Sequence, residues 1–394
     1  MQLTIEKADL LQALKRVAAI VPRSNTIPIV GMLKLEADDD VLNITGTDLE
    51  MWCSADALCA DIETSGAVCV PVERFEAFAR GVPDGAQIML ELSDADGRLN
   101  LRAGRMRARL ATLPADDYPT GDFDAWPHAF ALDAPVLAGM LNHTTALVGN
   151  IKNQWYLSGV FMEAVDRTTD EPAKLRFSAT DGKRFGRIEA ALPADGDMPE
   201  HDEQDPPDGS PRRAGVIVPG RTCQHILRLL DGVEGDAQLR FSPNAMAVEL
   251  DGVRIVSKLV AGRFPFTERM IPDEIETPIE TDPARLLACV QRIAAISGVL
   301  TTDKDPTIRV AVADGALDLS GRTAGNDAEA EDEVEASYEG EDYVFGFNPK
   351  WAADAFGWGG DRVHIHQTGP TAPLLIRDPA QPDRLHVFMP VLTK

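Results

Sequence analysis

One sequence pattern occurs three times along this chain of 394 residues. Residues 68–82, 216–230 and 343–356 each contain β-branched or aromatic residues, then a proline, then apolar residues at helical spacing. A proline is tolerated in the first turn of a helix, because its missing N–H has no partner there, so each copy predicts a strand that leads into a helix. Repetition at so long a period indicates one structural module used three times. Function is then expected from the assembled modules rather than from one pocket.

Each copy also contains an earlier helix and further strands. The earlier helices are predicted by apolar side chains three and four positions apart, as in Leu10, Leu14 and Val17. The predicted helices cover 9–20, 134–148 and 283–296, and the strands that follow them cover 29–35, 159–164 and 307–312. The expected fold is α+β, with three tandem modules, each of two helices packed on antiparallel sheets. Their expected bounds are 1–126, 127–275 and 276–394.

Acidic residues dominate the charge, with 63 Asp and Glu against 38 Lys and Arg and a net charge of −25. Such a protein repels nucleic acid over most of its surface. The six predicted helices are together close to neutral, so the acid is concentrated in strands and loops, notably at 194–209 and 326–335. Two interpretations are equally open: charge segregated for a function, or a solvated shell without one. The prolines and carboxylates of 194–213 predict a loop insertion with no assigned function.

The rest of the composition predicts a cytoplasmic protein. No run of about 18 apolar residues indicates a membrane span, and residues 1–7 lack the basic and apolar layout of a signal peptide. Five cysteines, an odd number without paired spacing, indicate reduced thiols rather than disulfides or a zinc site. We therefore expect no metal and no cofactor.

Residues 180–184, Thr-Asp-Gly-Lys-Arg, superficially resemble a phosphate-binding loop. Phe177 stands where the first glycine of that motif belongs, and Arg184 replaces the Ser or Thr that would hold magnesium. An Asp-Gly turn between two strands is the better interpretation, with 46–51 as its counterpart in the first copy. Lys183 and Arg184 make the second copy unusual.

No catalytic constellation emerges from the sequence. His364 and His366 share one face of a predicted strand, as two metal ligands could, but a solvated strand face explains them better. Nucleophile elbows and His-Glu-x-x-His helices are absent from the sequence, and seven histidines give little support to acid–base chemistry. Residues 150–156, which end in Trp155 and Tyr156, allow two interpretations: a hairpin with a half-buried ring, or a loop that stacks on bases or a sugar–phosphate edge.

Seven short stretches, taken in order, give the chain a family resemblance. They are 26–29, 46–51, 112–119, 179–184, 257–265, 346–348 and 389–390. With the threefold repeat, they make the chain resemble the beta sliding clamps of bacterial DNA polymerase III over essentially its whole length. The resemblance implies a non-enzymatic processivity factor, a head-to-tail homodimeric ring with inner helices and outer sheets that encircles duplex DNA. Weak, sequence-independent phosphate contacts suit a ring that slides, which would explain neutral helices beside an acidic exterior.

The resemblance also implies partners and site residues. The partners are duplex DNA, a clamp loader, the polymerase III catalytic subunit and other proteins whose linear motif enters a groove between the second and third modules, with no membrane involved. For DNA, the matching positions are Arg23, Arg74, Lys152, Gln154, Trp155, Tyr156 and Arg221; for ring closure, Ala108, Leu110 and Ile296. For the groove they are Leu157, Thr180, Gly182, Lys183, Arg184, Phe185, Pro265, Arg269, Met270, Asn348, Trp351, Val387, Met389, Pro390 and Val391.

Residue chemistry suits such a groove. Phe185, Met270, Val387 and Met389 are expected to form an apolar slot, since flexible methionines accommodate varied ligands. The two arginines of the set are expected to receive acidic or carbonyl groups of a peptide.

The chain departs from the family at some of these positions. Lys183 replaces a histidine, and Phe185 and Val391 replace leucine and methionine, which is expected to shift peptide preference. Ala108 replaces a larger aromatic residue at the expected dimer contact, and Arg23 lies one position away from the usual arginine.

Two other function classes remain open on the sequence. One is an enzyme with residues such as Asp181, His364 and His366 scattered over the repeats, which turnover or a bound metal would support. The other is a scaffold that binds linear peptide motifs without DNA, which salt-independent DNA association would support.

Overall fold

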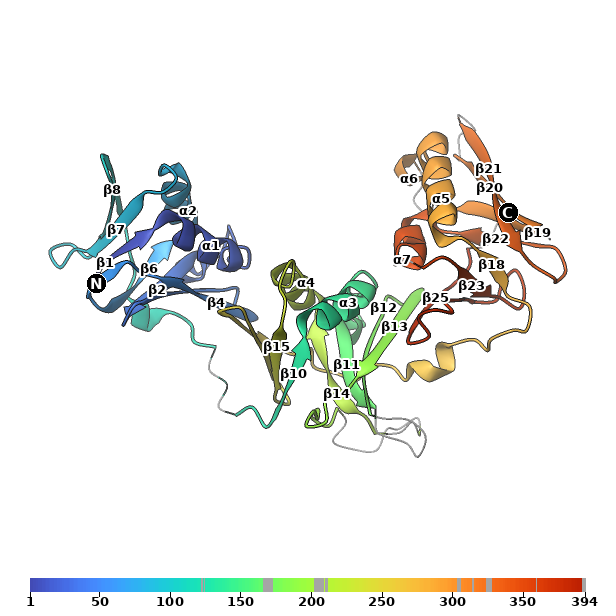
Figure 1. Ribbon diagram of the computed structural model, residues 1–394, viewed down its shortest axis with the longest axis horizontal. Coiled ribbons are helices and arrows are strands. Elements are labelled where there is room, and N and C mark those ends of the chain that lie inside the picture. The colour runs from blue at the N-terminus through green and yellow to red at the C-terminus, as the bar shows by residue number, and fades with distance from the viewer. Residues whose placement is uncertain are drawn as a thin grey trace. The chain divides into compact units, whose positions relative to one another are not determined.

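The computed structural model describes residues 1–121, 123, 125–165, 173–201, 209, 212–302, 306–313, 315–323, 328–358 and 360–391 (Figure 1). Much of the expected loop insertion at 194–213 lies outside these residues. The chain divides into two compact units. The first contains Met1–Ala138, Pro193–Pro199 and Arg221–Leu259, and the second contains Gly139–Leu192, Glu200–Gly220 and Val260–Lys394.

The first unit contains two sheets, in which every strand pair is antiparallel. The smaller has the order β5 (Asp61–Thr64), β1 (Gln2–Glu6), β7 (Gln87–Leu92), β8 (Leu99–Ala103) and β9 (Met106–Leu110). The larger has the order β10 (His128–Asp133), β15 (Asp236–Phe241), β16 (Ala245–Leu250), β17 (Val253–Lys258), β4 (Met51–Leu58), β3 (Val41–Thr47), β2 (Met32–Asp38) and β6 (Gly66–Pro71).

The second unit is built on one sheet of twelve strands. Its order is β14 (Ala214–Pro219), β11 (Gly159–Val165), β12 (Lys174–Thr180), β13 (Arg184–Ala191), β25 (Arg384–Phe388), β24 (Leu374–Arg377), β23 (Val363–His366), β18 (Ile279–Thr281), β21 (Glu329–Ser337), β20 (Gly315–Arg322), β19 (Ile308–Ala313) and β22 (Tyr343–Phe347). Strands far apart in the sequence therefore lie side by side, as β13 and β25 do.

The predicted strand-to-helix pattern is present in all three copies. β6 leads into α2 (Val72–Gly81), and β14 leads into α4 (Gly220–Leu229). β22 leads into a 3-10 turn, η5 (Pro349–Trp351), and the short helix α7 (Ala352–Phe356). The repeat is thus confirmed, with a shortened helix in the third copy.

The earlier helices are α1 (Lys7–Val17), α3 (Ala134–Thr145) and α5 (Pro283–Ser297). At the start of α5, Asp282 accepts hydrogen bonds from the backbone N–H of Ala284 and Arg285, and Gly298 ends the helix at a φ of 70°. The apolar faces are buried as their spacing predicts, and each fully buried Leu or Val contributes about 1.5–3 kcal/mol. Leu10, Leu14 and Val17 of α1 are all at most 1% exposed.

One predicted strand begins later than expected. Residues 29–35 were expected to be extended, but Pro28–Gly31 form a 3-10 turn, η1, and β2 begins at Met32. Pro28 starts the turn, and Ile29 and Val30 pack against Cys69 and Tyr118 instead of joining the ladder. Tertiary packing thus overrides strand propensity here.

The sheets continue across the expected module boundaries. β17 pairs with β4, and β25 pairs with β13, so the last strand of one expected module joins a sheet of the preceding one. The division of the chain into two compact units consequently falls inside the second expected module. No helix in the described part of the chain is long and apolar enough to cross a membrane.

Candidate functional site

The turn at 180–184 has the same hydrogen bonds as its counterpart at 47–51. The Thr180 hydroxyl donates to the carbonyl of Arg184 (2.6 Å), as Thr47 donates to Met51 (2.8 Å). The Asp181 carboxylate accepts from the N–H of Lys183 (2.9 Å) and Arg184 (2.8 Å). Gly182 has a φ of 83° and Leu49, at the matching place, a φ of 74°. The predicted structural turn is confirmed, and glycine avoids the strain that a left-handed leucine bears.

Arg184 is the polar centre of this region. Its guanidinium forms ion pairs with Asp181 (Nε to Oδ2, 2.9 Å) and Asp354 of α7 (Nη1 to Oδ2, 2.6 Å). It also lies over the Trp351 ring, 5.7 Å from the ring centroid. Burial raises the pKa of Asp354, and Arg184 partly offsets that rise. Arg184 is therefore held in place by two carboxylates and an indole ring.

An apolar cluster lies on the adjoining strands. Phe185 of β13 faces Val387 of β25 in the antiparallel register, and both side chains are buried with Leu375 and Leu385. Ile271 packs against these four residues. We call these five residues the β13–β25 cluster.

Exposed methionines flank the β13–β25 cluster along the chain. Met270 precedes Ile271 and is 39% exposed, and Met389 is 45% exposed two residues after Val387. The N–H of Met389 donates to the carbonyl of Lys183 (2.9 Å), and that of Val391 to Gly346 (2.9 Å). The structure thus joins the 180–185 turn to the end of β25.

Other residues of the predicted groove have structural partners nearby. Leu157 is buried. It lies near the turn because both approach Gly149: a Cβ added to Gly149 would be 3.4 Å from Leu157 Cβ and 3.2 Å from the carbonyl oxygen of Thr180. The carbonyl of Pro265 accepts from Arg213 (3.2 Å). Asn348 accepts from the N–H of Lys350 and begins η5, Pro390 is half-buried, and Arg269 lies over the Phe266 ring at 5.7 Å.

Four residues of this region were missed from the sequence. Leu375 and Leu385 lie in short apolar runs that mark strands, and Ile271 follows two predicted groove residues. Asp354 carries no such signal, because its partner Arg184 is 170 positions away.

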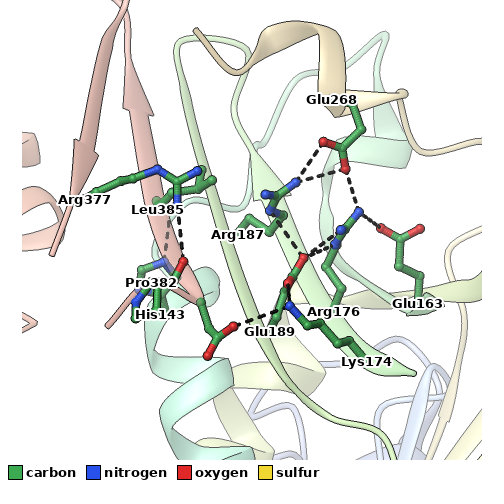
Figure 2. Close-up of polar contacts among 11 residues, drawn as sticks. His143, Glu163, Lys174, Arg176, Arg187, Glu189, Glu268, Arg377, Pro382 and Leu385 are labelled. Carbon is green, nitrogen blue, oxygen red and sulfur yellow. Dashed lines mark hydrogen bonds and ion pairs between the residues drawn. The ribbon is translucent and has the colours of Figure 1, made fainter. Parts of the chain in front are cut away.

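Beside the cluster, charged side chains form a connected network on β11, β12 and β13 (Figure 2). Arg176 contacts Glu189 (2.7 Å) and Glu268 (2.6 Å), with Glu163 at 3.6 Å. Arg187 contacts both oxygens of Glu268 (2.9 and 3.0 Å). Burial raises the pKa of Glu163, whereas at Glu189 the neighbouring Arg176 and Lys174 outweigh burial and lower the pKa.

Two buried histidines lie behind Phe185 and Val387. His386 of β25 and His143 of α3 approach to 3.2 Å through Nε2 and Nδ1, and His143 Nε2 lies 3.2 Å from the carbonyl of Leu385. Burial lowers the pKa of His143 to about 4 and that of His386 well below its ordinary value. Both rings are therefore neutral near pH 7.

The residues predicted to contact DNA are mostly exposed. Trp155 begins a 3-10 turn, η3 (Trp155–Leu157), is 59% exposed and donates from Nε1 to the carbonyl of Ala261 (2.8 Å). Tyr156 is half-buried against the cluster that contains Leu157. The hairpin interpretation of this segment is wrong, since the chain turns there without pairing strands.

The other predicted DNA contacts differ in exposure, and Arg221 among them has an ion-pair partner within the described residues. Arg23, Arg74 and Lys152 are exposed, and Gln154 is half-buried. The Arg221 side chain is 61% exposed and forms an ion pair with Asp48 (2.7 Å).

The predicted closure residues lie on an edge strand and a helix. Ala108 and Leu110 belong to β9, which ends the five-stranded sheet. Leu110 is 6% exposed, so it packs within its own unit, and Ile296 of α5 is 65% exposed.

The expectation of a solvated strand face is wrong for His366. This ring is 5% exposed and its Nδ1 accepts from the N–H of Ile275 (3.1 Å), because the segment before β18 covers it. His364 lies 3.5 Å from Glu280. Within the described residues, no three His, Cys, Asp or Glu side chains are placed to hold a metal ion.

The tandem helix-and-sheet repeat, in which the last strand of one module pairs with the sheet of the module before it, defines a modular repeat protein. Protein-family models cover almost the whole chain. The N-terminal, central and C-terminal domains of the DNA polymerase III beta subunit match residues 1–122, 131–266 and 268–392.

Known proteins and structures agree with these matches. The Caulobacter vibrioides beta sliding clamp is 32% identical over 99% of this chain and 100% of its own length. A DNA polymerase sliding clamp structure from Caulobacter crescentus aligns with a TM-score of 0.88 at 31% identity, and a Bartonella birtlesii clamp bound to griselimycin with 0.88 at 28% identity, each over 100% of both chains. The chain belongs to the DNA polymerase III beta subunit family, the beta sliding clamps. It is a DNA sliding clamp, which tethers a polymerase, built from three tandem clamp domains.

Proposed function

We propose that two copies of this chain close head to tail into a ring around duplex DNA, with module limits near 1–126, 127–275 and 276–394. The observation that carries this proposal is how the repeat pairs strands. β17 pairs with β4 and β25 pairs with β13, so each last strand of a module extends the preceding module's sheet. The corresponding strands left over are β9 of the first module and β21 of the third.

These two strands offer edges to each other. Among the described residues β9 has β8 as its one partner strand, and β21 pairs with β20 on one side and, only at Ala336 and Ser337, with β18 on the other. An unpaired edge is a template for another chain. When β9 of each copy pairs with β21 of the other, the dimer has two such joints. Both edge strands of each copy are then paired, and the ring is closed.

Charge supports the same pairing. β9 presents Arg107 and Arg109 to solvent, and β21 presents Glu331 and Glu333. Opposite charges across an interface guide association and fix its register. Ile296 is the exposed apolar residue of α5, which packs on β21, so it supplies an apolar contact for Ala108 beside the charges.

For DNA, we propose sequence-independent contacts from Arg23, Arg74, Lys152 and Arg221, with Trp155 and Tyr156 resting on the duplex edge. Retention is topological, so these contacts need only be weak. The chain then acts as a processivity subunit, in the cytoplasm, without catalytic residues of its own.

For proteins, we propose that linear motifs of the polymerase III catalytic subunit, the clamp loader and other partners dock on the β13–β25 cluster and its flanking methionines. The remaining predicted groove residues border this docking surface. We infer that griselimycin, bound in the Bartonella structure, is a ligand of this surface here too.

Loading on nicked circular DNA tests the ring. The loaded protein should remain on the circle through gel filtration and be lost when one restriction cut linearises the DNA. Retention on the linear product would contradict topological binding. A monomeric mass in solution would contradict the dimer.

A further inference from the structure

The segment that carries the predicted groove residues Arg269 and Met270 is held by polar contacts at both of its ends. We call residues 264–275 the strap. At one end Arg213 donates to the carbonyl of Pro265 (3.2 Å). At the other, Glu274 forms an ion pair with Arg377 of β24 (2.7 Å) and the N–H of Ile275 donates to His366.

Between these ties, Glu268 is the strap's ionic anchor (Figure 2). It lies in the 3-10 turn η4 (Thr267–Met270) and binds Arg176 of β12 at 2.6 Å and Arg187 of β13 at 2.9 and 3.0 Å. Contact with two guanidinium groups fixes the direction of the carboxylate as well as its distance.

Glu268 gives both arginines a further close carboxylate. Their side chains are 17% and 14% exposed, and they are backed by Glu163 and Glu189, at 7% and 9%. Lys174 also shares Glu189 (3.1 Å). Lys174 has a second carboxylate, Asp383, at 3.6 Å. Arg187 lies 3.7 Å from Glu189 but 2.9 Å from Glu268, so Glu268 is its closer carboxylate. A largely buried guanidinium that loses its closest carboxylate is destabilised, so the network holds the turn down.

The η4 turn also fixes the side chains next to it. The N–H of Ile271 donates to the carbonyl of Glu268 (3.4 Å), and Ile271 packs on the β13–β25 cluster. Met270 lies between these two fixed residues and is 39% exposed. Its position at the border of the cluster therefore depends on Glu268.

We propose that Glu268 is a positioning residue of the docking surface: through Arg176 and Arg187 it holds the strap so that Met270 forms one wall for a bound peptide. Glu268 itself does not contact the peptide. This inference rests on the proposed docking of linear motifs on the β13–β25 cluster.

Calorimetric titration of the full-length chain with griselimycin tests it. Glu268→Gln keeps the size of the side chain and removes its charge, and should weaken binding about fivefold. Glu276→Gln is the matched control: it removes a carboxylate just past the strap that has no ion pair within the described residues, and should bind as the unaltered chain does.

A double-mutant cycle separates positioning from general destabilisation. Met270→Ala should itself weaken binding, and adding Glu268→Gln should then cost less than about twofold more, because the side chain that Glu268 positions is gone. Glu268→Asp keeps the charge with a shorter reach. It should lose about twofold, again only when Met270 is present, and it replaces the Gln variant if that one does not fold.

Unchanged binding by the Glu268 variants, or equal losses with and without Met270, would overturn this inference alone. Failure of the unaltered chain to bind griselimycin would contradict the proposed docking function, and the inference with it.

Discussion

Phe185 lies directly opposite Val387 where β13 pairs with β25. Trp52 and Val256 are opposed in the same way where β4 pairs with β17, so the repeat builds this apolar pair at two junctions. The pairs differ in what covers them. Phe123 packs edge-on against Trp52, with ring centroids 6.1 Å apart, and Trp126 adds a second ring, whereas Ile271 packs on Phe185 and Val387. Phe185 and Val387 are nevertheless the more buried pair, at 1% and 5% exposed against 9% and 6% for Trp52 and Val256. The apolar surface that the second junction leaves for a partner is therefore that of the flanking Met270 and Met389, at 39% and 45% exposed.

Replacing Phe185 tests how far this pair supports the fold. Phe185 is 1% exposed, so Phe185→Ala should lower the free energy of unfolding by about 3–5 kcal/mol through lost burial and a cavity. Phe185→Leu keeps most of the volume and should cost less than about 1.5 kcal/mol. Urea unfolding followed by tryptophan fluorescence measures both. Equal, small losses would show that the strand pairing does not depend on this ring.

Met389 should matter for binding and little for folding. Its side chain is 45% exposed while its backbone is fixed by Lys183, so Met389→Ala leaves the strand intact. We expect the affinity for a polymerase-tail peptide to fall about tenfold, the loss of an apolar anchor. Leu58→Ala, which removes an apolar side chain that is 69% exposed in the other unit, is the control and should change nothing. Deleting residues from 387 onward is a poorer test, because it removes Val387 from its pairing with Phe185.

The sequence predicts the repeat well because its signals are local. Apolar spacing places α1 and α5 within a few residues, and the Asp-Gly pair predicts the turn that Thr180 and Asp181 then close. Partners on distant strands have no local signal. The contact between Arg184 and Asp354 joins β13 to α7, and the strap's anchor at Glu268 joins η4 to β12 and β13. Both contacts appear only in the folded chain. The groove residues themselves were indicated by family resemblance, not by periodicity.

Acid should weaken the second unit through its buried histidines. In the folded chain His143 has a pKa of about 4, against about 6.5 when unfolded, so between these values the unfolded state binds more protons. The stabilisation that neutral His143 contributes is therefore fully present above about pH 6.5. It is lost as the pH drops towards 4, which lowers the free energy of unfolding by up to about 3 kcal/mol for this group. Urea unfolding at pH 7.5 and 5 measures the change. His143→Gln should reduce the slope, and an undiminished slope would place the effect elsewhere.

Trp155 is expected to contribute to DNA contact through its exposed ring. Trp155→Ala should weaken association with primed duplex DNA about tenfold, within the range for loss of one stacking ring. Trp155→Phe keeps a ring but loses the hydrogen bond to Ala261, so its affinity for DNA should lie between those of the unaltered chain and the alanine variant. Ile151→Ala, a control in the same loop at a residue 38% exposed, should bind normally. Fluorescence anisotropy across a salt series measures these affinities, and unchanged binding by the alanine variant would return Trp155 to a structural role.

Exchanging charges between β9 and β21 tests the direction of ring closure. Arg107→Glu with Arg109→Glu makes β9 acidic, so that it faces the acidic β21 of the partner copy. Glu331→Lys with Glu333→Lys makes β21 basic, so that it faces the basic β9 of the partner copy. Each variant alone should dissociate at least about tenfold more readily, since like charges across an interface cost several kcal/mol. A mixture of the two should form dimers again, because in the mixed ring each joint brings opposite charges together. Native mass spectrometry distinguishes the mixed dimer. If β9 paired with β9 of the other copy, the unaltered joint would already place Arg against Arg, and the first variant alone would only replace it with Glu against Glu. Unchanged dimerisation of the single variants, or failure of the mixture to form dimers, would therefore contradict head-to-tail closure.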